Sequence, residues 1–261
     1  METTPVRYAT TGEGVVTVTL DQPETRNALS DFLLKELIAA LQRAEADADI
    51  RCIVIASSHE GVFSAGGDLG AFRDERSVVE KYHGADLFPE LFLLIGRLSK
   101  PVIAAVNGHA LAGALGLVLA CDLVIAAEDA GFGCPEINIG AFPFMVSALL
   151  SRSIGRLKAN ELMYFGDRIS AKEAQQLGIV NHVVGERDFL KTVDDWSSRL
   201  ASKSPLILRM GKESTAAISD MSVPEALHFM QGQLALAFST DDLQEGVNAF
   251  FDHREPVWTG T

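Results

Sequence analysis

The chain has 261 residues, of which 48% are apolar and 22% are charged, and its formal net charge is −13. That length allows one large domain or two small ones around a sizeable core. The excess of acidic residues disfavours nucleic acids and anionic membranes as partners. An anionic ligand would need local cations, such as Arg26, or a helix N-terminus.

Three cysteines, Cys52, Cys121 and Cys134, lie in apolar stretches and have no CxxC spacing. We expect buried thiols in a reducing compartment. The first residues, METTPVRYATTG, have neither a basic start nor an apolar run; we therefore expect no signal peptide and a cytoplasmic location. The apolar stretch 102–121 is about long enough for a membrane span, but polar residues and glycines interrupt it. A buried strand followed by a helix is the better interpretation.

Strand and helix patterns alternate through the first half of the chain. Apolar, β-branched runs predict strands at 15–20, 51–56, 101–106 and 122–126. Ser30 has the character of a helix N-cap, and further helices are expected at 71–99 and 113–120. The segment 61–69 is expected to be a loop and Asn107-Gly108 a turn. This alternation indicates an α/β fold with right-handed crossovers.

Helical patterns dominate after residue 150. Ser170 with Glu173 and Ser222 with Glu225 form capping boxes, and Gly178 ends the first of these helices. Periodicity alone leaves open whether this part is a separate domain or an oligomerisation layer.

The segment GVFSAGGDL at 61–69 could present a backbone N–H group to a ligand. Gly66 and Gly67 have no Cβ, which allows a close approach to the backbone, and Asp68 could cap the following turn. An ordinary glycine-rich turn is the alternative.

The segment AVNGHALAGALGLVLACD at 105–122 predicts a strand that leads into a helix near Gly113. The free N–H groups and the dipole at that helix start favour negative charge, so this is a candidate second donor. The alternative is that small residues serve only tight packing. The segment has neither the GxGxxG nor the Walker pattern.

Glu136 follows Pro135 in a stretch that is apolar up to Met145. Desolvation there would raise the pKa of the carboxyl group toward the range used in proton transfer. An exposed loop glutamate is the alternative. Two N–H donors and one such carboxylate suit proton transfer beside a carbonyl that becomes an oxyanion.

Three motifs in this order and spacing, FSAGGDL, AVNGHALAGALGLVLACD and FGCPEINIG, resemble those of the enoyl-CoA hydratase/isomerase (crotonase) family. The segments 26–29, 174–180 and 245–256 extend the resemblance over nearly the whole chain. It implies an α/β spiral of ββα units at 1–195 and a C-terminal helical trimerisation region at 196–261. It also implies a homotrimer or a dimer of trimers, acyl-CoA as substrate, and no cofactor beyond the coenzyme A of that substrate.

The resemblance also implies roles for individual residues. Gly67 and Gly113 would donate their N–H groups to the thioester oxygen, and Glu136 would be the acid/base. Arg26 matches a position near the CoA phosphates. The remaining substrate-binding candidates are backbone or side chains around these segments: Ala28, Leu29, Ala65, Asp68, Leu69, His109, Leu111, Gly116 and Pro135.

Three departures from the family pattern bear on the reaction. Hydratases carry a first catalytic glutamate three residues after the second oxyanion glycine, where this chain has Gly116. The glycine-rich run that follows the second glutamate in hydratases is here Pro143-Phe144-Met145, which is closer to the isomerase version. His253 replaces a lysine that contacts CoA in some members.

Other polar residues are weaker candidates. His83 and Asp86 lie on a segment that supplies an extra catalytic side chain in some members, although a solvated helix face is the simpler interpretation. His109 could face the acyl chain or be structural. No cluster with metal-ligand spacing occurs in the sequence, and no metal is expected.

These observations favour an isomerase-like enzyme that uses Glu136 alone. A hydratase that adds water to 2-enoyl-CoA is the main alternative, and an acyl-CoA-binding protein with reduced catalysis is a third. Thioester hydrolysis and decarboxylation stay open, since the same oxyanion hole serves them.

Overall fold

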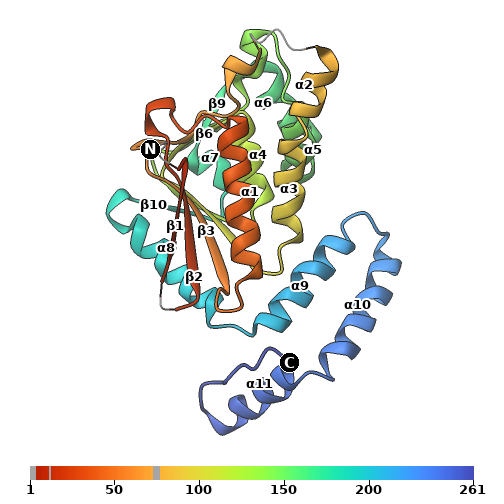
Figure 1. The fold of residues 1–261 in the computed structure, drawn as a ribbon. Helices are drawn as coiled ribbons and strands as arrows, with labels where there is room; N and C mark the ends of the chain where they lie inside the picture. Colours follow the sequence, from red (N-terminus) through yellow and green to blue (C-terminus); the bar gives the residue numbers. More distant parts are fainter. Residues whose placement is uncertain (1–3, 12, 73–76) are drawn as a thin grey trace.

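Figure 1 shows the protein as a computed structural model, which describes residues 4–11, 13–72 and 77–261. Within these residues the strands form a large sheet of order β1-β2-β3-β5-β7-β10 and a small sheet of order β4-β6-β8-β9. The large sheet contains β1 (Val6–Thr10), β2 (Val15–Leu20), β3 (Cys52–Ser57), β5 (Val102–Val106), β7 (Leu123–Ala127) and β10 (His182–Val184). The small sheet contains β4 (Gly61–Ser64), β6 (Gly108–Leu111), β8 (Gly131–Gly133) and β9 (Arg168–Ser170).

The two sheets are built by a repeated ββα unit. Each of β3, β5 and β7 in the large sheet is followed directly by β4, β6 or β8 in the small sheet, and then by helical chain. The neighbours β3-β5-β7 and β4-β6-β8 pair in parallel. The expected α/β spiral of ββα units is therefore confirmed.

Helices cover both faces of the large sheet. Alternate side chains of β2, β3, β5 and β7, such as Val54 and Ile103, pack with Phe189 and Val193 of α8 (Glu186–Ala201). The opposite set joins the main core together with α1 (Asp31–Ala46), α3 (Leu87–Arg97) and α4 (Gly113–Ala120). Burial on both faces is typical of parallel sheets and explains the continuous apolar strands in the sequence.

Helix α1 shows how local sequence determines an element. The Ser30 hydroxyl accepts a hydrogen bond from the Leu33 N–H at 3.3 Å, as expected of an N-cap. The apolar face of this helix is buried in the main core and consists of Leu33, Leu34, Leu37, Ile38 and Leu41. The predicted helix start and its buried face are both confirmed.

Three local expectations were wrong. Residues 61–64 and 108–111, expected as loop and turn, are the strands β4 and β6, which pair with each other. A Cβ atom at Gly108 would lie 2.1 Å from the Gly61 carbonyl carbon, so this pairing requires glycine. The segment 71–99 contains a 3₁₀ turn and two helices, α2 (Val78–Gly84) and α3, instead of one helix, while residues 73–76 lie outside the described chain.

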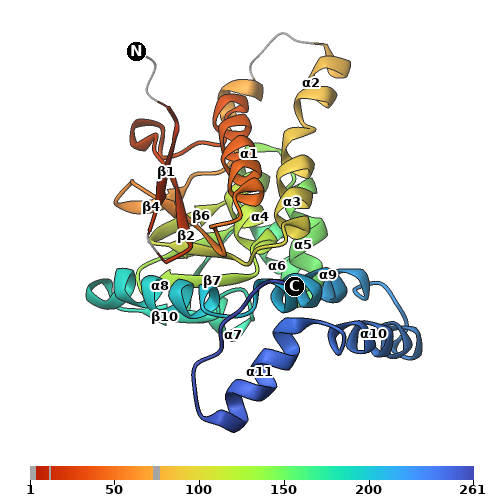
Figure 2. The same cartoon turned by 60° about the horizontal axis from the view of Figure 1, so that its bottom comes forward.

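The later part of the chain adds helices on the outside of the sheets. They are α5 (Phe144–Ile154), α6 (Arg156–Phe165), α7 (Ala171–Gln176), α8, α9 (Pro205–Ala217), α10 (Val223–Ala237) and α11 (Asp241–Asp252). Both predicted capping boxes are present, at the starts of α7 and α10. Figure 2 shows α9 at the level of α8, and α10 and α11 extending beyond that layer. The expected division at 195/196 falls inside α8 and stays a prediction.

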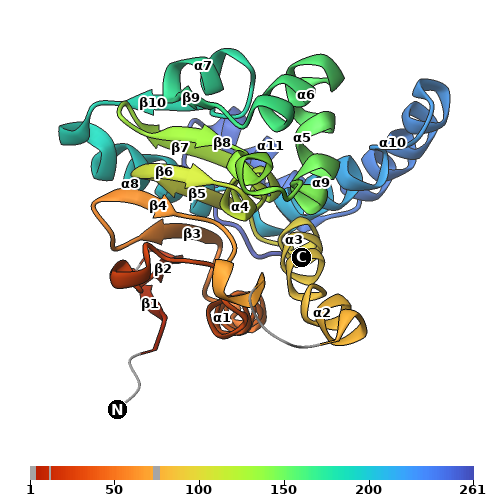
Figure 3. The same cartoon turned by 90° about the horizontal axis from the view of Figure 1, so that it is seen from above.

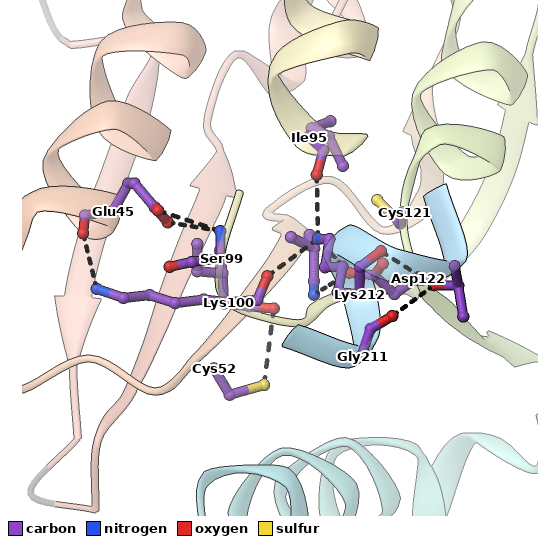
Figure 4. Close-up of polar contacts among 12 residues, drawn as sticks. Glu45, Cys52, Ile95, Ser99, Lys100, Cys121, Asp122, Gly211 and Lys212 are labelled. Carbon is purple, nitrogen blue, oxygen red and sulfur yellow. Dashed lines mark hydrogen bonds and ion pairs between the residues drawn. The ribbon is translucent and has the colours of Figure 1, made fainter. Parts of the chain in front are cut away.

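A buried ammonium group attaches α9 to the sheet (Figure 4). Lys212 donates hydrogen bonds to the carbonyls of Ile95 and Lys100, at 3.1 and 3.0 Å, and to the Asp122 carboxylate at 2.7 Å. The same oxygen of Asp122 accepts the Val102 N–H at 2.7 Å. Lys212 therefore links α9 to the last turn of α3 and to the starts of β5 and β7.

None of the helices in the described residues is long and apolar enough to cross a membrane. The apolar stretch 102–121 is divided among β5, β6 and α4, as its glycines and polar residues indicated. The described residues also contain no group of three or more metal-ligating side chains placed to hold a metal ion.

Candidate active site

The three segments that carry the candidate catalytic groups leave the small sheet at the same edge. The strands β4, β6 and β8 are parallel neighbours, with Ser64 paired to Ala110 and Leu111 paired to Gly133. The chain then continues into Gly67 after β4, Gly113 after β6 and Glu136 after β8 (Figure 3). The carboxyl ends of parallel strands meet at one edge of a sheet, so these segments, distant in sequence, converge.

The two glycine-rich segments touch each other. A Cβ atom at Gly66 would lie 2.5 Å from Ala112 Cβ and 2.6 Å from the Leu111 carbonyl oxygen. A Cβ atom at Gly113 would lie 3.6 Å from the Gly67 nitrogen. In the described part of the chain, neither the Gly67 N–H nor the Gly113 N–H has a hydrogen-bond acceptor. The predicted pair of free backbone donors is thus brought together.

Ala112, which joins β6 to α4, has an unusual backbone conformation with φ 54° and ψ −130°. A residue with a Cβ rarely occupies that region, at a cost on the order of 1–3 kcal/mol. The Ala112 N–H donates to the Gly133 carbonyl at 2.9 Å, which fixes the turn against β8. The conformation begins α4 at Gly113 without a capping side chain, so the Gly113 N–H remains available, whereas the Leu115 N–H already donates to the Ala112 carbonyl at 2.9 Å.

Glu136 lies in a 3₁₀ turn at Pro135–Ile139, directly after β8. Its Oε2 atom is buried and has no hydrogen-bond partner among the residues that the structure describes. Burial raises the pKa of this carboxyl group above its ordinary value, and a hydrogen bond from its own backbone N–H opposes the rise. The predicted direction of the pKa shift is confirmed, and a proton-transfer group needs this kind of environment.

A buried asparagine, which our sequence interpretation missed, attaches the segment 26–29 to the segment that leads to Gly67. The fully buried Asn27 donates hydrogen bonds to Ser57 Oγ at 2.8 Å and to the Phe63 carbonyl at 3.1 Å. The backbone carbonyl of Asn27 accepts a hydrogen bond from the Ser64 hydroxyl at 2.7 Å. Ser64 Oγ in turn accepts one from the Gly66 N–H at 3.2 Å. The sequence signal that could have identified Asn27 is its position in the motif RNAL at 26–29, which belongs to the family resemblance.

Backbone pairing places the predicted residues of segment 26–29 beside the Gly67 segment. The Ala65 N–H donates to the Arg26 carbonyl at 3.0 Å, and the Leu29 N–H donates to the Gly66 carbonyl at 2.8 Å. Leu29 is buried and forms a bridge to Gly67, Ala28 is half-buried, and the Arg26 side chain is exposed. An exposed guanidinium at this edge is available to an anion.

The other predicted side chains surround the same edge. Asp68 accepts the Gly70 N–H at 2.8 Å, which confirms its capping role, and Leu69 is exposed beside it. The ring of His109 lies against Gly131, where a Cβ would come within 2.7 Å of Nδ1, and that nitrogen is buried without a partner. Leu111 ends β6, and Pro135 begins the turn that carries Glu136.

Two phenylalanines of α3, not identified from the sequence, cover the glycines of α4. A Cβ at Gly113 would lie 2.7 Å from Phe88 Cε1, and one at Gly116 would lie 2.5 Å from Phe92 Cζ and 3.2 Å from Val146 Cγ2. The two rings contact each other edge to face, with centroids 6.1 Å apart. The space where hydratases carry their first glutamate is therefore occupied by an aromatic ring.

The structure does not place the weaker candidates among these groups. His83 is in α2, but its side chain is not among the described ones, and Asp86 precedes α3 at the surface. Cys52 and Cys134 are buried, and burial raises the pKa of both thiols to about 12. Burial also raises the pKa of the half-buried Cys121. The expected burial of the thiols is confirmed for Cys52 and Cys134, and the reducing compartment stays a prediction.

Comparisons with known proteins agree with this architecture. The family model for enoyl-CoA hydratase/isomerase matches residues 10–261. A probable mitochondrial enoyl-CoA hydratase of Dictyostelium discoideum is 37% identical over 92% of this chain and 86% of its own length. The 2,3-dehydroadipyl-CoA hydratase of Escherichia coli is 34% identical over 94% of this chain and 95% of its own. The crystal structure of an enoyl-CoA hydratase from Bacillus anthracis, 31% identical, superposes with a TM-score of 0.93 over 98% of this chain and 100% of that one.

The chain therefore belongs to the enoyl-CoA hydratase/isomerase family and is an enzyme of that family. The names of the relatives are mostly those of hydratases.

Proposed function

We propose that this enzyme moves the double bond of a 3-enoyl-CoA to the 2-position, with Glu136 as the single acid/base. Glu136 takes a proton from the α carbon, and the electron pair of the broken C–H bond spreads onto the thioester oxygen and, through the β,γ double bond, to the γ carbon. The same carboxyl group returns the proton to the γ carbon, so no water or second acid enters the reaction. Arg26 is proposed to contact the CoA phosphates, and residues 28–29, 65–69 and His109 to line the path of the substrate.

The environment of Glu136 is the observation that carries the proposal. A carboxyl group with a buried oxygen that lacks a partner, and with a raised pKa, can hold and release a proton near neutral pH more readily than an exposed one. Because its acidity depends on desolvation, it does not require a neighbouring carboxylate.

The two free amides supply the other requirement, stabilisation of the enolate. Gly67 and Gly113 donate from a rigid backbone, and Gly113 adds the positive end of α4. Preorganised donors of this kind contribute on the order of 10²–10³ each in rate.

Position 116 supports isomerisation over hydration. Addition of water is usually described with two carboxylates that share the water molecule, and here Phe92 and Val146 fill the space beside Gly116. Both side chains are almost fully buried. The side chains nearest to Gly116 are therefore apolar and supply no acid at that point.

Hydration of 2-enoyl-CoA is the second candidate, since the named relatives are mostly hydratases. It would require an additional acid that the chain supplies from elsewhere. A homotrimer or a dimer of trimers is also proposed, because α10 has no buried residue and carries exposed apolar side chains such as Leu227 and Leu234.

The test is product analysis by NMR in deuterated water with 3-enoyl-CoA and 2-enoyl-CoA, using the wild type and Glu136→Gln. The proposal expects deuterium at the α and γ carbons and a shifted double bond in the wild type, and neither in the variant. Formation of 3-hydroxyacyl-CoA would establish the hydratase instead. Binding of both substrates without any change would indicate an acyl-CoA-binding protein.

A further inference from the structure

The face of the two oxyanion glycines is covered by a side chain from another element. Phe88, in the first turn of α3, has its Cζ atom 3.7 Å from the position of a Cβ at Gly67 and 3.3 Å from that of a Cβ at Gly113. One ring therefore spans both glycines. A group bound to their N–H groups lies beside this ring.

The ring is part of a continuous apolar wall. Phe88 contacts Phe92 edge to face, and Phe92 and Val146 lie against Gly116 one turn further along α4. Phe92 is 9% exposed and Val146 2% exposed, so neither has free space to move into. The wall joins α3 to α5 across the glycine face of α4.

The helix that carries the two rings is fixed at its other end. Lys212 donates to the Ile95 carbonyl in the last turn of α3, and the Leu98 N–H closes that turn on the Leu94 carbonyl at 3.0 Å (Figure 4). Leu91 and Ile95 are fully buried on the same helix. The backbone that carries Phe88 is therefore held by core residues and by an ammonium group, and the ring itself is half-buried.

We infer that Phe88 sets the size of the acyl group and restricts this enzyme to short-chain acyl thioesters. The inference rests on the proposed function, because it places the thioester oxygen at the N–H groups of Gly67 and Gly113. The acyl carbons nearest that oxygen then meet the edge of the Phe88 ring, and a long chain finds no open path on this side. Replacing the ring with a smaller side chain frees the space that it occupies beside the two glycines.

Binding of saturated acyl-CoA thioesters tests this inference without any reaction. Butanoyl-CoA, octanoyl-CoA and dodecanoyl-CoA are titrated calorimetrically into the wild type, Phe88→Ala and the control Leu93→Ala. Leu93 lies on the same helix but is 54% exposed. Each methylene newly buried tightens binding about fourfold. We therefore expect affinity to rise on the order of tenfold or more with chain length in Phe88→Ala, and not to rise in the wild type or the control.

Three outcomes would overturn the inference. The first is a wild type whose affinity already rises with chain length, and the second is a Phe88→Ala variant whose affinity does not. The third is a wild type that binds none of the thioesters while Phe88→Ala binds them all, since the ring would then block the site. Phe88→Leu keeps an apolar side chain in the first turn and is expected to give an intermediate profile, which serves if the alanine variant fails to fold.

The binding experiment distinguishes failure of this inference from failure of the proposed function. If the enzyme hydrates rather than isomerises, the dependence of affinity on chain length is still expected to change as described. If no acyl-CoA binds to any variant, the proposed function fails together with the inference.

Discussion

The ring of Phe92 lies so close to Gly116 that a Cβ there would come within 2.5 Å of its Cζ atom. We therefore expect Gly116→Glu to be destabilised by about 1–3 kcal/mol, or more, through overpacking. Combined with Phe92→Ala, the glutamate gains space, and the two changes should be less destabilising together than their sum, because residues in contact do not act additively.

A double-mutant cycle by urea unfolding measures this coupling. The double variant also places a carboxylate where hydratases of the family carry one. We expect it to add water to crotonyl-CoA faster than either single variant. Additive losses of stability, within error, would contradict the contact, and hydration that is equally fast in wild type would contradict the isomerase proposal.

The pH dependence of Glu136 follows from the direction of its pKa shift. The base form must be present for α-proton abstraction, so the acid limb of kcat/KM for isomerisation should lie above pH 4.5, the ordinary value of the group. The folded protein retains this proton at pH values where the unfolded chain has lost it. Stability contributed at this residue should therefore fall as pH rises from about 4.5 through the folded pKa.

Glu136→Gln removes the cost of ionising a buried carboxyl group and keeps the shape of the side chain. We expect the variant to be inactive and, at neutral pH, at least as resistant to urea as the wild type. A variant that is clearly less stable at neutral pH would show that the carboxylate makes stabilising contacts, and the desolvation account would be wrong.

The fold could be predicted where local rules determine it. Ser30 with its apolar helix face and the β-branched strand β2 follow from capping and periodicity within a few residues. The strands β4 and β6 could not be found in this way. They are four residues each, and they pair because Gly108 has no Cβ and so lets its backbone lie against that of Gly61, which is far away in sequence.

The candidate site could be predicted only as far as its motifs extend. Gly67, Gly113 and Glu136 are recognisable by sequence, and the structure brings their segments to one edge of the small sheet. Phe88 and Phe92 were missed because an aromatic residue in an amphipathic helix is normally a core residue. Their contacts depend on how α3 packs on α4, which short sequence patterns do not determine. The available signal was the pair of glycines in α4, because a helix with two glycines leaves space for side chains of a neighbouring element.

The role of the Gly113 N–H can be tested by a matched pair of substitutions. Gly113→Ala and Gly113→Pro both add a Cβ, which would lie 2.7 Å from Phe88 Cε1, but only proline removes the N–H. Proline is tolerated at the first position of a helix. We expect kcat for the proline variant to be on the order of 10²–10³ lower than for the alanine variant. Equal activity in two folded variants would contradict the oxyanion assignment.

Lys212 should be the main polar attachment of α9 to the core. Its side chain is 12% exposed and that of its partner Asp122 is 31% exposed, so Lys212→Met leaves a partly exposed carboxylate and two carbonyls without the ammonium group. Because water can reach the Asp122 carboxylate, we expect a loss of about 2 kcal/mol, as for a hydrogen bond to a charged group. Lys158→Met is the matched control, because its ion pair with Glu161 is 36% and 52% exposed and should contribute about 0.5 kcal/mol or less. Urea unfolding followed by circular dichroism gives both values, and similar losses in the two variants would show that the Lys212 contacts add no more than a surface pair.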